Sequence, residues 1–165
     1  AQIMLGNAYR EGTMGLKKSL KRASRLYDLA SAQGHAQAQF ALGWSYEHGY
    51  GVKINFKTSA LWYRRAAEQR HPLAQYHFGR MFYAGKGVAQ SYDEAVKWFR
   101  LAAAQGQPNA LYNLGVCHYN GYGAPQDLDE AIRLLKRAAA KGHAGAAPCV
   151  AQLEGHLSAT RSSPA

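Results

Sequence analysis

The amino-acid sequence repeats itself about every 36 residues, and this period constrains the fold more than any other feature. A glycine that follows a large apolar residue recurs four times, and another glycine comes six residues after each. The two sets are Gly6, Gly43, Gly79, Gly115 and Gly12, Gly49, Gly85, Gly121. One unit of this length cannot bury its apolar face alone, whereas stacked copies bury a continuous core. The period therefore predicts a solenoid.

Each unit is expected to form two helices. The first is predicted over residues 36–48, 72–84 and 108–120, with a first copy near 1–11, and it ends in a Gly-x-Gly turn. The second is predicted over residues 19–33, 55–69, 91–105 and 127–141, with N-cap candidates Ser19, Asn55, Ser91 and Asp127. Ser91 with Glu94, and Asp127 with Glu130, have the spacing of capping boxes. No strand-like alternation appears, so the fold class is all-α.

The adjacent aromatics Trp98 and Phe99 suggest three roles: a membrane-insertion face, a ligand-stacking platform or packing. The residues at the equivalent positions of the other repeats decide between these roles. The column of Trp98 also holds Leu26, Trp62 and Leu134, and that of Phe99 holds Tyr27, Tyr63 and Leu135. A column that accepts both Trp and Leu requires bulk and no particular ring, so packing is predicted.

The column pattern resembles the Sel-one-like repeat (SLR), a relative of the tetratricopeptide repeat. The clearest copies are Ala38, Leu42-Gly43, Tyr46, Gly49-Tyr50-Gly51-Val52 and Ala95, Trp98-Phe99, Ala102-Ala103, Gly106. The resemblance covers about residues 1–146. It implies a right-handed α/α superhelical solenoid and a role as an adaptor or scaffold in signalling, stress response, secretion or envelope assembly.

The predicted organisation is a single solenoid over residues 1–157. Its four repeats span about 1–34, 35–70, 71–106 and 107–142. Residues 143–157 form a degenerate fifth copy, a helix from Ala146 to about Leu157 that caps the last repeat. Residues 158–165 are small and polar and are expected to form a flexible tail.

Variable columns at helical spacing indicate where a partner binds. On the first helix of each unit, one such column lies two residues before the glycine, a second lies one residue after it, and the third lies a turn further on. These columns predict a groove formed by Trp44, His48, His77, Arg80, Asn113 and Asn120. The simpler alternative is a solvated face without a binding role. The sequence thus favours a non-catalytic module that binds a peptide or partner protein through its concave face.

The net charge of +10 permits a different function. Repeat one carries five cations within nine residues: Lys17, Lys18, Lys21, Arg22 and Arg25. With further cations on the second helices they would form a basic convex ridge for nucleic acid phosphates or an anionic membrane. An ordinary solvated outer face explains the same residues, and it is the favoured interpretation because no nucleic-acid-binding motif is present. Nucleic acid and membrane partners are accordingly not expected.

Metal, cofactor and catalytic chemistry are not expected either. His35, His71 and His143 occupy one repeat column and would lie about 10 Å apart at successive helix starts, too far to share a metal ion. Cys117 and Cys149 are expected to be free thiols. No motif supplies a nucleophile with its base, and no small-molecule substrate is expected. No signal peptide is visible, which favours a cytoplasmic location, although the chain can be a fragment of a longer protein.

Overall fold

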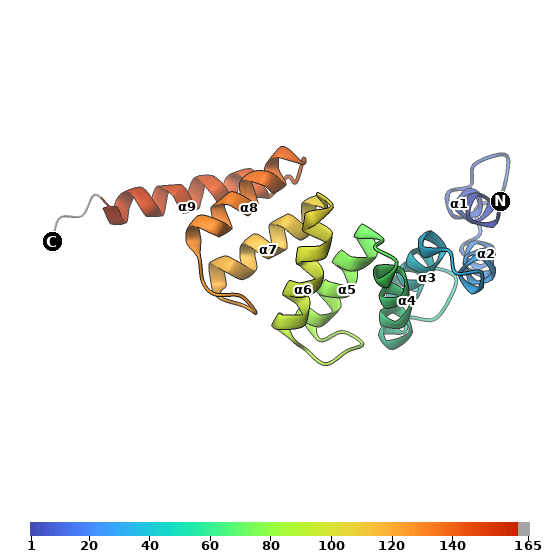
Figure 1. Cartoon of the computed structure of the whole chain (residues 1–165). Helices are drawn as coiled ribbons and strands as arrows, with labels where there is room; N and C mark the ends of the chain where they lie inside the picture. The colour runs from blue at the N-terminus through green and yellow to red at the C-terminus, as the bar shows by residue number, and fades with distance from the viewer. Residues whose placement is uncertain (162–165) are drawn as a thin grey trace. The chain divides into compact units, whose positions relative to one another are not determined.

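The computed structural model describes the backbone of residues 1–161 and the side chains of residues 1–155, and the regular structure in this part of the chain is entirely helical. Figure 1 shows the order of the helices: α1 (Gln2–Glu11), α2 (Leu20–Ala32), α3 (Ala36–His48), α4 (Phe56–Glu68), α5 (Pro72–Ala84), α6 (Tyr92–Ala104), α7 (Pro108–Asn120), α8 (Leu128–Ala140) and α9 (Ala146–Arg161). This is the predicted all-α solenoid of four helix-turn-helix repeats followed by a C-terminal helix.

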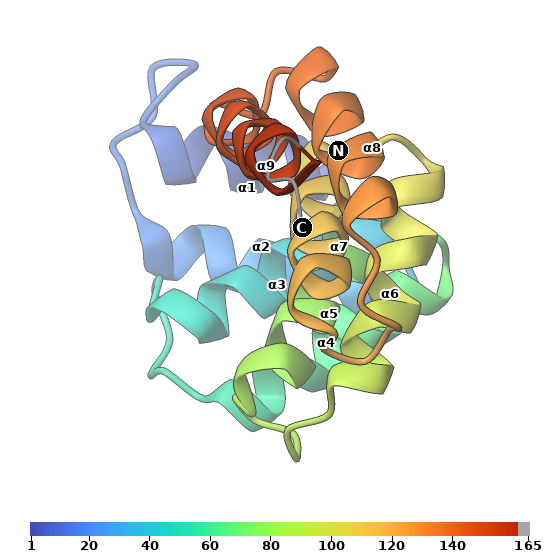
Figure 2. The ribbon, with the colours of Figure 1, turned by 90° about the vertical axis from the view of Figure 1, so that its left-hand side faces the viewer.

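The described chain forms two compact units. The first comprises residues 1–90 with α1 to α5, and the second begins at Ser91 and contains α6 to α9. Within each unit every helix packs against the next one along the chain, as two perpendicular views show (Figures 1 and 2). The prediction of one solenoid over residues 1–157 remains a prediction.

The predicted helices lie where the sequence places them, because both of their ends are encoded locally. The first helices of repeats two to four coincide with the predicted ranges, and the second helices are one residue shorter at each end. The N-cap side chains of Ser19, Asn55, Ser91 and Asp127 each accept a hydrogen bond from the backbone N–H three residues later. Each first helix ends at a glycine in the left-handed conformation, with φ between 65° and 75°.

The predicted capping box at Asp127 is only half formed. The Asp127 side chain accepts from Glu130 N at 2.9 Å, as expected. The backbone N–H of Asp127, however, donates to the carbonyl of His118 at 2.9 Å, and the Glu130 carboxylate accepts from the Arg133 guanidinium. Because the backbone N–H of Asp127 already has an acceptor in the preceding helix, the Glu130 side chain pairs with Arg133 of its own helix instead.

Glycines in the first helices make room for large side chains on the second helices. A Cβ added to Gly43 would lie 2.7 Å from the Tyr63 ring, and one added to Gly6 would lie equally close to the Tyr27 ring. The whole column of Tyr27, Tyr63, Phe99 and Leu135 is buried. The packing role predicted for Phe99 is therefore confirmed. Trp98 is half-buried.

The last glycine of each Gly-x-Gly turn has a second role besides its positive φ. A Cβ on Gly51 would lie 2.3 Å from the backbone carbonyl oxygen of Leu20, the first residue of α2. Gly87 and Gly123 approach the carbonyls of Phe56 and Tyr92, the first residues of α4 and α6, equally closely. The turns of repeats two to four thus pack directly on the backbone of the preceding second helix.

The C-terminal helix begins at Ala146, as predicted, which is two residues later than the repeat period alone would place it. A start at residue 144 would place Pro148 where its missing N–H breaks the ladder and its ring clashes with a carbonyl. The start at Ala146 puts Pro148 in the first turn, where no backbone donor is needed. Val150 and Leu153 of α9 are buried against Ile132 and Leu135 of α8. The helix continues to Arg161, and residues 162–165 of the expected tail lie outside the described residues.

Candidate functional site

The first unit contains a cavity of about 450 Å³, here called the aromatic cavity. Its walls come from three consecutive first helices and one turn: Arg10 of α1; Gln37, Phe40, Ala41 and Trp44 of α3; Tyr50 of the turn after α3; and Leu73 and His77 of α5. A volume of this size accommodates a small molecule or the side chains of a short peptide.

Rings that contact one another form the wall of this cavity. The imidazole of His77 meets the Trp44 indole edge-on, with ring centroids 5.1 Å apart, and lies 5.6 Å from the Phe40 ring. His48 stacks on Trp44 at 4.1 Å, and its Nδ1 lies 3.0 Å from the Trp44 carbonyl oxygen. Each ring is fixed by a neighbour, so the wall is preorganised before any ligand arrives.

The Glu47 carboxylate does not line the cavity but lies next to His77 of this wall. The Tyr63 hydroxyl donates to Glu47 Oε2 at 2.7 Å, and Arg80 Nη2 lies 3.7 Å from Glu47 Oε1. His77 Nδ1 lies 3.6 Å from Glu47 and 3.2 Å from Arg80 Nη1. When Nδ1 carries a proton, in one neutral tautomer or in the cation, its N–H faces Glu47; when the proton is on Nε2 alone, Nδ1 accepts from Arg80.

The protonation of this network follows from burial and from these contacts. Burial raises the pKa of Glu47, but hydrogen bonds from His77 and Tyr63 and the nearby cationic charges outweigh it, and the pKa falls to about 2. Burial lowers the pKa of His77 below its usual value, and the Glu47 carboxylate opposes this shift only in part. Burial, reinforced by Glu47, raises the pKa of Tyr63. At neutral pH Glu47 is thus charged and compensated by Arg80, while His77 and Tyr63 are uncharged.

The five cations of repeat one, the basic cluster, lie on another surface of the same unit. Lys17, Lys18, Lys21, Arg22 and Arg25 are all exposed, on α2 and in the loop before it. Within residues 1–155 none of them has an ion pair, and Arg22 only covers the Tyr9 ring at 5.4 Å.

Other cations of the predicted ridge are paired. They form Arg64–Glu68 at 2.8 Å, Lys97–Glu94 at 2.5 Å, Arg133–Glu130 at 2.6 Å and Lys136–Glu154 at 2.6 Å. Much of the ridge is therefore neutralised locally, whereas the basic cluster is not.

Comparison with protein-family models assigns four consecutive copies of one repeat. The Sel1 repeat model matches residues 1–35, 36–71, 72–107 and 108–143. The chain belongs to the Sel1-repeat family. Members of this family generally mediate protein–protein interactions and are generally non-catalytic repeat scaffolds. A comparison with curated proteins finds no match.

Solved structures of Sel1-repeat proteins are similar over most of the chain. A Sel1 repeat protein from Oxalobacter formigenes is 36% identical with a TM-score of 0.87, over 92% of this chain and 60% of its own. The protective antigen c5321 of uropathogenic Escherichia coli, which displays an SLR fold, is 35% identical with a TM-score of 0.82, over 86% of this chain and 30% of its own. Helicobacter pylori cysteine rich protein B, at 20% identity and a TM-score of 0.63, shares the fold and matches 80% of this chain and 95% of its own. This chain thus spans less than two thirds of the first two proteins.

The Sel1 repeats bring four of the six predicted groove residues together. Trp44 and His77 line the aromatic cavity, His48 stacks on Trp44, and Arg80 contacts His77. Asn113 and Asn120 lie on α7 in the second unit. Asn113 is half-buried there, and the Asn120 amide donates to the Val116 carbonyl of its own helix at 3.0 Å.

Sequence reasoning missed the other cavity residues and the carboxylate behind them. Phe40 belongs to an aromatic column with Tyr76 and Tyr112, which reads as packing. Glu47 shares its column with Arg10, Tyr83 and Tyr119, so nothing marks it as buried. The partner Tyr63 provides a signal that could have pointed to Glu47. Its phenol lies in a column of buried side chains and therefore needs a hydrogen-bond acceptor.

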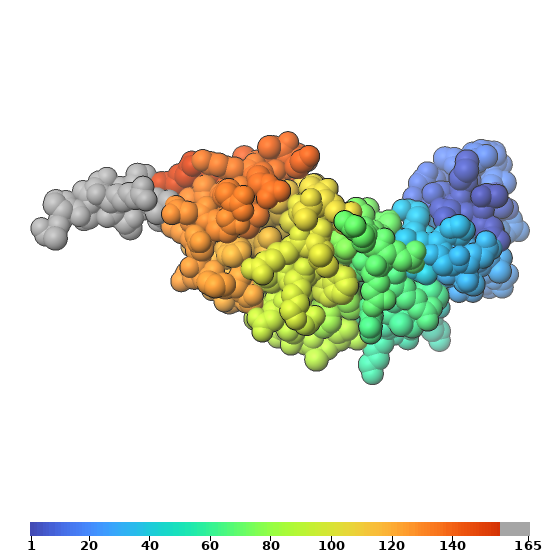
Figure 3. Space-filling model, in the orientation of Figure 1, coloured from blue at the N-terminus to red at the C-terminus, as the bar shows by residue number. Residues whose placement is uncertain are grey.

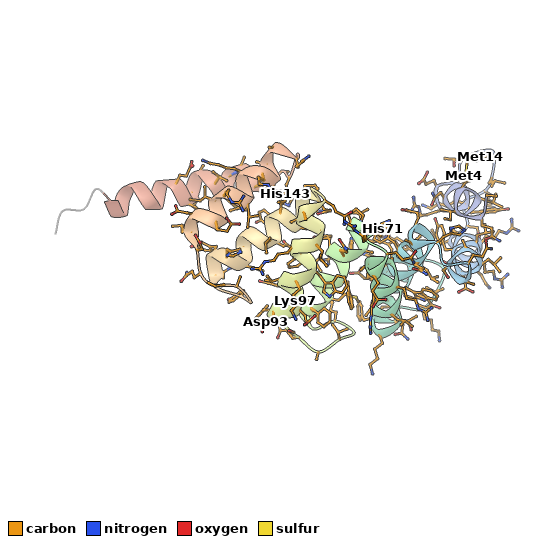
Figure 4. The ribbon with its side chains drawn as sticks, viewed as in Figure 1. Met4, Met14, His71, Asp93, Lys97 and His143 are labelled. Atoms are coloured by element: carbon orange, nitrogen blue, oxygen red, sulfur yellow. The ribbon has the colours of Figure 1, made fainter. Side chains whose placement is uncertain are left out.

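No group of three or more His, Cys, Asp or Glu side chains in the described part of the chain could hold a metal ion. His71 lies at the start of α5 (Figure 4), where its Nδ1 accepts from Ala74 N at 3.2 Å. Its repeat counterpart Gln107 caps α7 in the same way. This histidine column therefore serves as an N-cap in repeats three and four.

Both cysteines are free thiols, as predicted. Cys117 is buried, which raises the pKa of its thiol to about 11, and Cys149 is half-buried with its Sγ 3.6 Å from the Tyr112 hydroxyl. Among the described residues, no helix combines the length and apolar character that crossing a membrane requires.

Proposed function

We propose that the chain is a non-catalytic protein-interaction module that binds a peptide segment of a partner protein in the aromatic cavity. The observation that carries this proposal is the cavity itself, an open space of about 450 Å³ that no described side chain of the protein fills. Three successive first helices contribute to it, and these are the helices that we expect to line the concave face of the solenoid.

The chemistry of the cavity favours an uncharged, bulky apolar anchor on the partner. Apart from Gln37 and Arg10, its walls are rings and aliphatic side chains, and Leu73 is 39% exposed. The only charged residue in the wall is Arg10, which is paired with Glu11 at 2.6 Å. Aromatic anchors in preformed pockets dominate the binding free energy of protein interfaces.

The proposal is tested by selecting binders from a random peptide library displayed on phage and measuring the selected peptides by fluorescence polarisation. Peptides that share a bulky apolar residue should bind wild type, and Trp44→Ala should weaken them by about tenfold or more. Leu73→Asp should have a similar effect because it places a charge in the apolar wall.

The matched control is Leu61→Asp, which introduces the same charge at a leucine that is 46% exposed in the same unit but outside the cavity wall. This variant should bind like wild type. Peptides that bind Trp44→Ala and Leu73→Asp as tightly as wild type would show that the aromatic cavity is not the binding site.

A further inference from the structure

A second cavity, here called the lateral cavity, adjoins the basic cluster. It has a volume of about 230 Å³ and is lined by Lys21, Ser24, Arg25 and Asp28 of α2, Leu42 and Tyr46 of α3, and Gly51 and Val52 of the following turn. On α3, Leu42 and Tyr46 are each two residues from aromatic-cavity residues, a rotation of about 200° around the helix. The lateral cavity therefore opens on the other side of α3.

The charges beside this cavity differ from those at the same columns of repeats three and four, while repeat two, with Lys57 and Thr58, has no acid there either. Lys21 and Arg22 occupy the columns of Asp93 and Glu94 in repeat three and of Asp129 and Glu130 in repeat four. Acids in the first turn of a helix interact favourably with its dipole, and cations there do not. The first turn of α2 holds no acid at all.

The same exchange removes an ion pair within the helix. Glu94 pairs with Lys97, and Glu130 pairs with Arg133, across a spacing of three residues. In α2 the corresponding residues are Arg22 and Arg25, two cations that repel each other. Repeat one thus carries charges that oppose its own helix, and such local conflicts are expected at functional sites.

We propose that the basic cluster and the lateral cavity form a second binding site, for an acidic peptide segment of a partner protein. Lys21 and Arg25 line the cavity and have no ion pair among residues 1–155, so they are available to carboxylates. Asp28 is the acid in the wall, and the two cations outnumber it. Leu42, Tyr46 and Val52 provide an apolar floor for the aliphatic part of a glutamate side chain.

The extent of the unpaired charge favours a short peptide over a nucleic acid or a membrane. Phosphate tracks require cations along the length of the polymer. Many of the corresponding cations in the later repeats are neutralised within the protein, as at Arg64, Lys97 and Arg133. Single cations without an ion pair among residues 1–155 occur elsewhere, as at Lys57 and Arg100, but the five that are close together in sequence belong to the first repeat, at the blue end of the space-filling view (Figure 3).

The test uses a fluorescein-labelled octaglutamate peptide and measures its fluorescence polarisation with the full chain at low and high salt. Wild type should bind it, with an affinity that falls as salt screens the charges, and should not bind labelled octaglutamine. Lys21→Gln/Arg25→Gln should weaken octaglutamate binding by about tenfold. All of these positions are exposed, so the fold is unaffected, which circular dichroism verifies.

The matched control is Lys57→Gln/Arg100→Gln, which removes the same total charge from two exposed cations that do not line the lateral cavity. It should bind octaglutamate within about twofold of wild type, since it leaves the site intact. Equal losses in both double variants, or no binding to wild type, would overturn the proposal. So would tighter binding of a thymidine oligonucleotide, or of vesicles of phosphatidylcholine and phosphatidylserine, with the same dependence on Lys21 and Arg25.

Discussion

A single carboxylate, Glu47, connects the wall of the aromatic cavity to the helix packing of repeat two. It accepts from Tyr63 on the second helix and lies beside His77 and Arg80 of the following repeat. The side chain of Glu47 is only 10% exposed, so the loss of one partner would leave a poorly solvated charge. The orientation of the ring wall in the cavity therefore depends on the ionisation of one residue outside it.

At the residue scale this dependence predicts an acid sensitivity. The pKa of Glu47 is lowered from 4.5 to about 2, so its contribution to the free energy of unfolding is present above pH 4.5 and is lost as the pH falls towards about 2. The shift corresponds to about 2 kcal/mol once partial solvent screening is allowed for. Glu47→Gln should lose this contribution, and its stability difference from wild type should shrink as the pH falls from 4.5 to 2.

Urea denaturation followed by circular dichroism at a series of pH values measures this difference. His77 contributes in a separate window: its lowered pKa favours the neutral ring, so that its contribution is present above pH 6.5 and decreases below it. Glu47→Gln removes the carboxylate that raises the pKa of His77, so the variant should also lose more stability than wild type between pH 6.5 and 4.5, and the Glu47 contribution itself is measured below pH 4.5. A stability difference that stays constant down to pH 2 would exclude the proposed ionisation of Glu47.

At the residue scale, helical spacing determined which residues of the site the sequence could predict. Trp44 and His77 fall in variable columns on the same helix face, and both line the cavity. Glu47 was not predictable in the same way, because its burial arises from Tyr63 on another helix and from His77 in another repeat. A pattern along one helix does not contain contacts between helices.

At the scale of the element, the charges at the start of α2 distinguish it from α6 and α8, whereas α4, like α2, has no acid in its first turn. Helices α6 and α8 each begin with two acids, whereas α2 begins with none and carries Lys21 and Arg22 instead. All three helices have the same length of 13 residues and a capping side chain at the N-terminus. Their differences in stability should therefore reflect mainly charge and packing.

Replacing the cations of α2 with the acids of α6 should stabilise the protein. Lys21→Asp/Arg22→Glu is expected to raise the free energy of unfolding by about 1 kcal/mol, since each favourable charge in the first turn contributes about 0.3–1 kcal/mol. The new glutamate at position 22 can also pair with Arg25, as Glu94 does with Lys97. The same variant should lose octaglutamate binding, so stability and binding would change in opposite directions.

Chemical denaturation of this variant beside Asp93→Lys/Glu94→Arg checks the argument with the opposite exchange. The second variant places cations at the start of α6 and removes the pair with Lys97, so it should be less stable than wild type. If Lys21→Asp/Arg22→Glu is no more stable than wild type, the charge conflict in α2 is not real.

The sequence predicted most helix ends because caps and turn glycines encode them locally. The start of α9 at Ala146 was predicted as well, although Pro148 shifts it away from the repeat period. The reciprocal half of the capping box at Asp127 was wrong. The N–H that it requires is taken by His118 of the preceding helix, which is a tertiary contact.

At the scale of the whole molecule, the described chain comprises two compact units built from the same repeat. Repeats in such arrays contact mainly their neighbours, so a local change in stability is expected to spread only a short distance. Gly43 is a suitable position for a local destabilising substitution, because an added Cβ would lie 2.7 Å from the Tyr63 ring.

Gly43→Ala should destabilise the first unit by about 1–3 kcal/mol, the usual cost of overpacking a core. Hydrogen exchange followed by mass spectrometry should show faster exchange in residues 1–90 than in wild type, with a smaller change from Ser91 onward. Gly155→Ala is the control, since a Cβ at this position of α9 would meet nothing within 4 Å. Equal acceleration in both units would mean that they unfold together.

The turn glycines at positions 51, 87 and 123 have a consequence for how such a chain can lengthen or shorten. Each one packs against the carbonyl at the start of the preceding second helix, a feature that every sequence presents alike. Leu20, Phe56 and Tyr92 occupy that position with unrelated side chains, and the close approach is the same at all three. The backbone contact between repeats is thus the same whichever side chain follows the cap, although side chains add contacts of their own, such as Lys86 over Phe56 and Tyr122 on Tyr92. A copy can therefore be duplicated, deleted or exchanged without loss of this backbone contact, while the binding residues on its surface diverge.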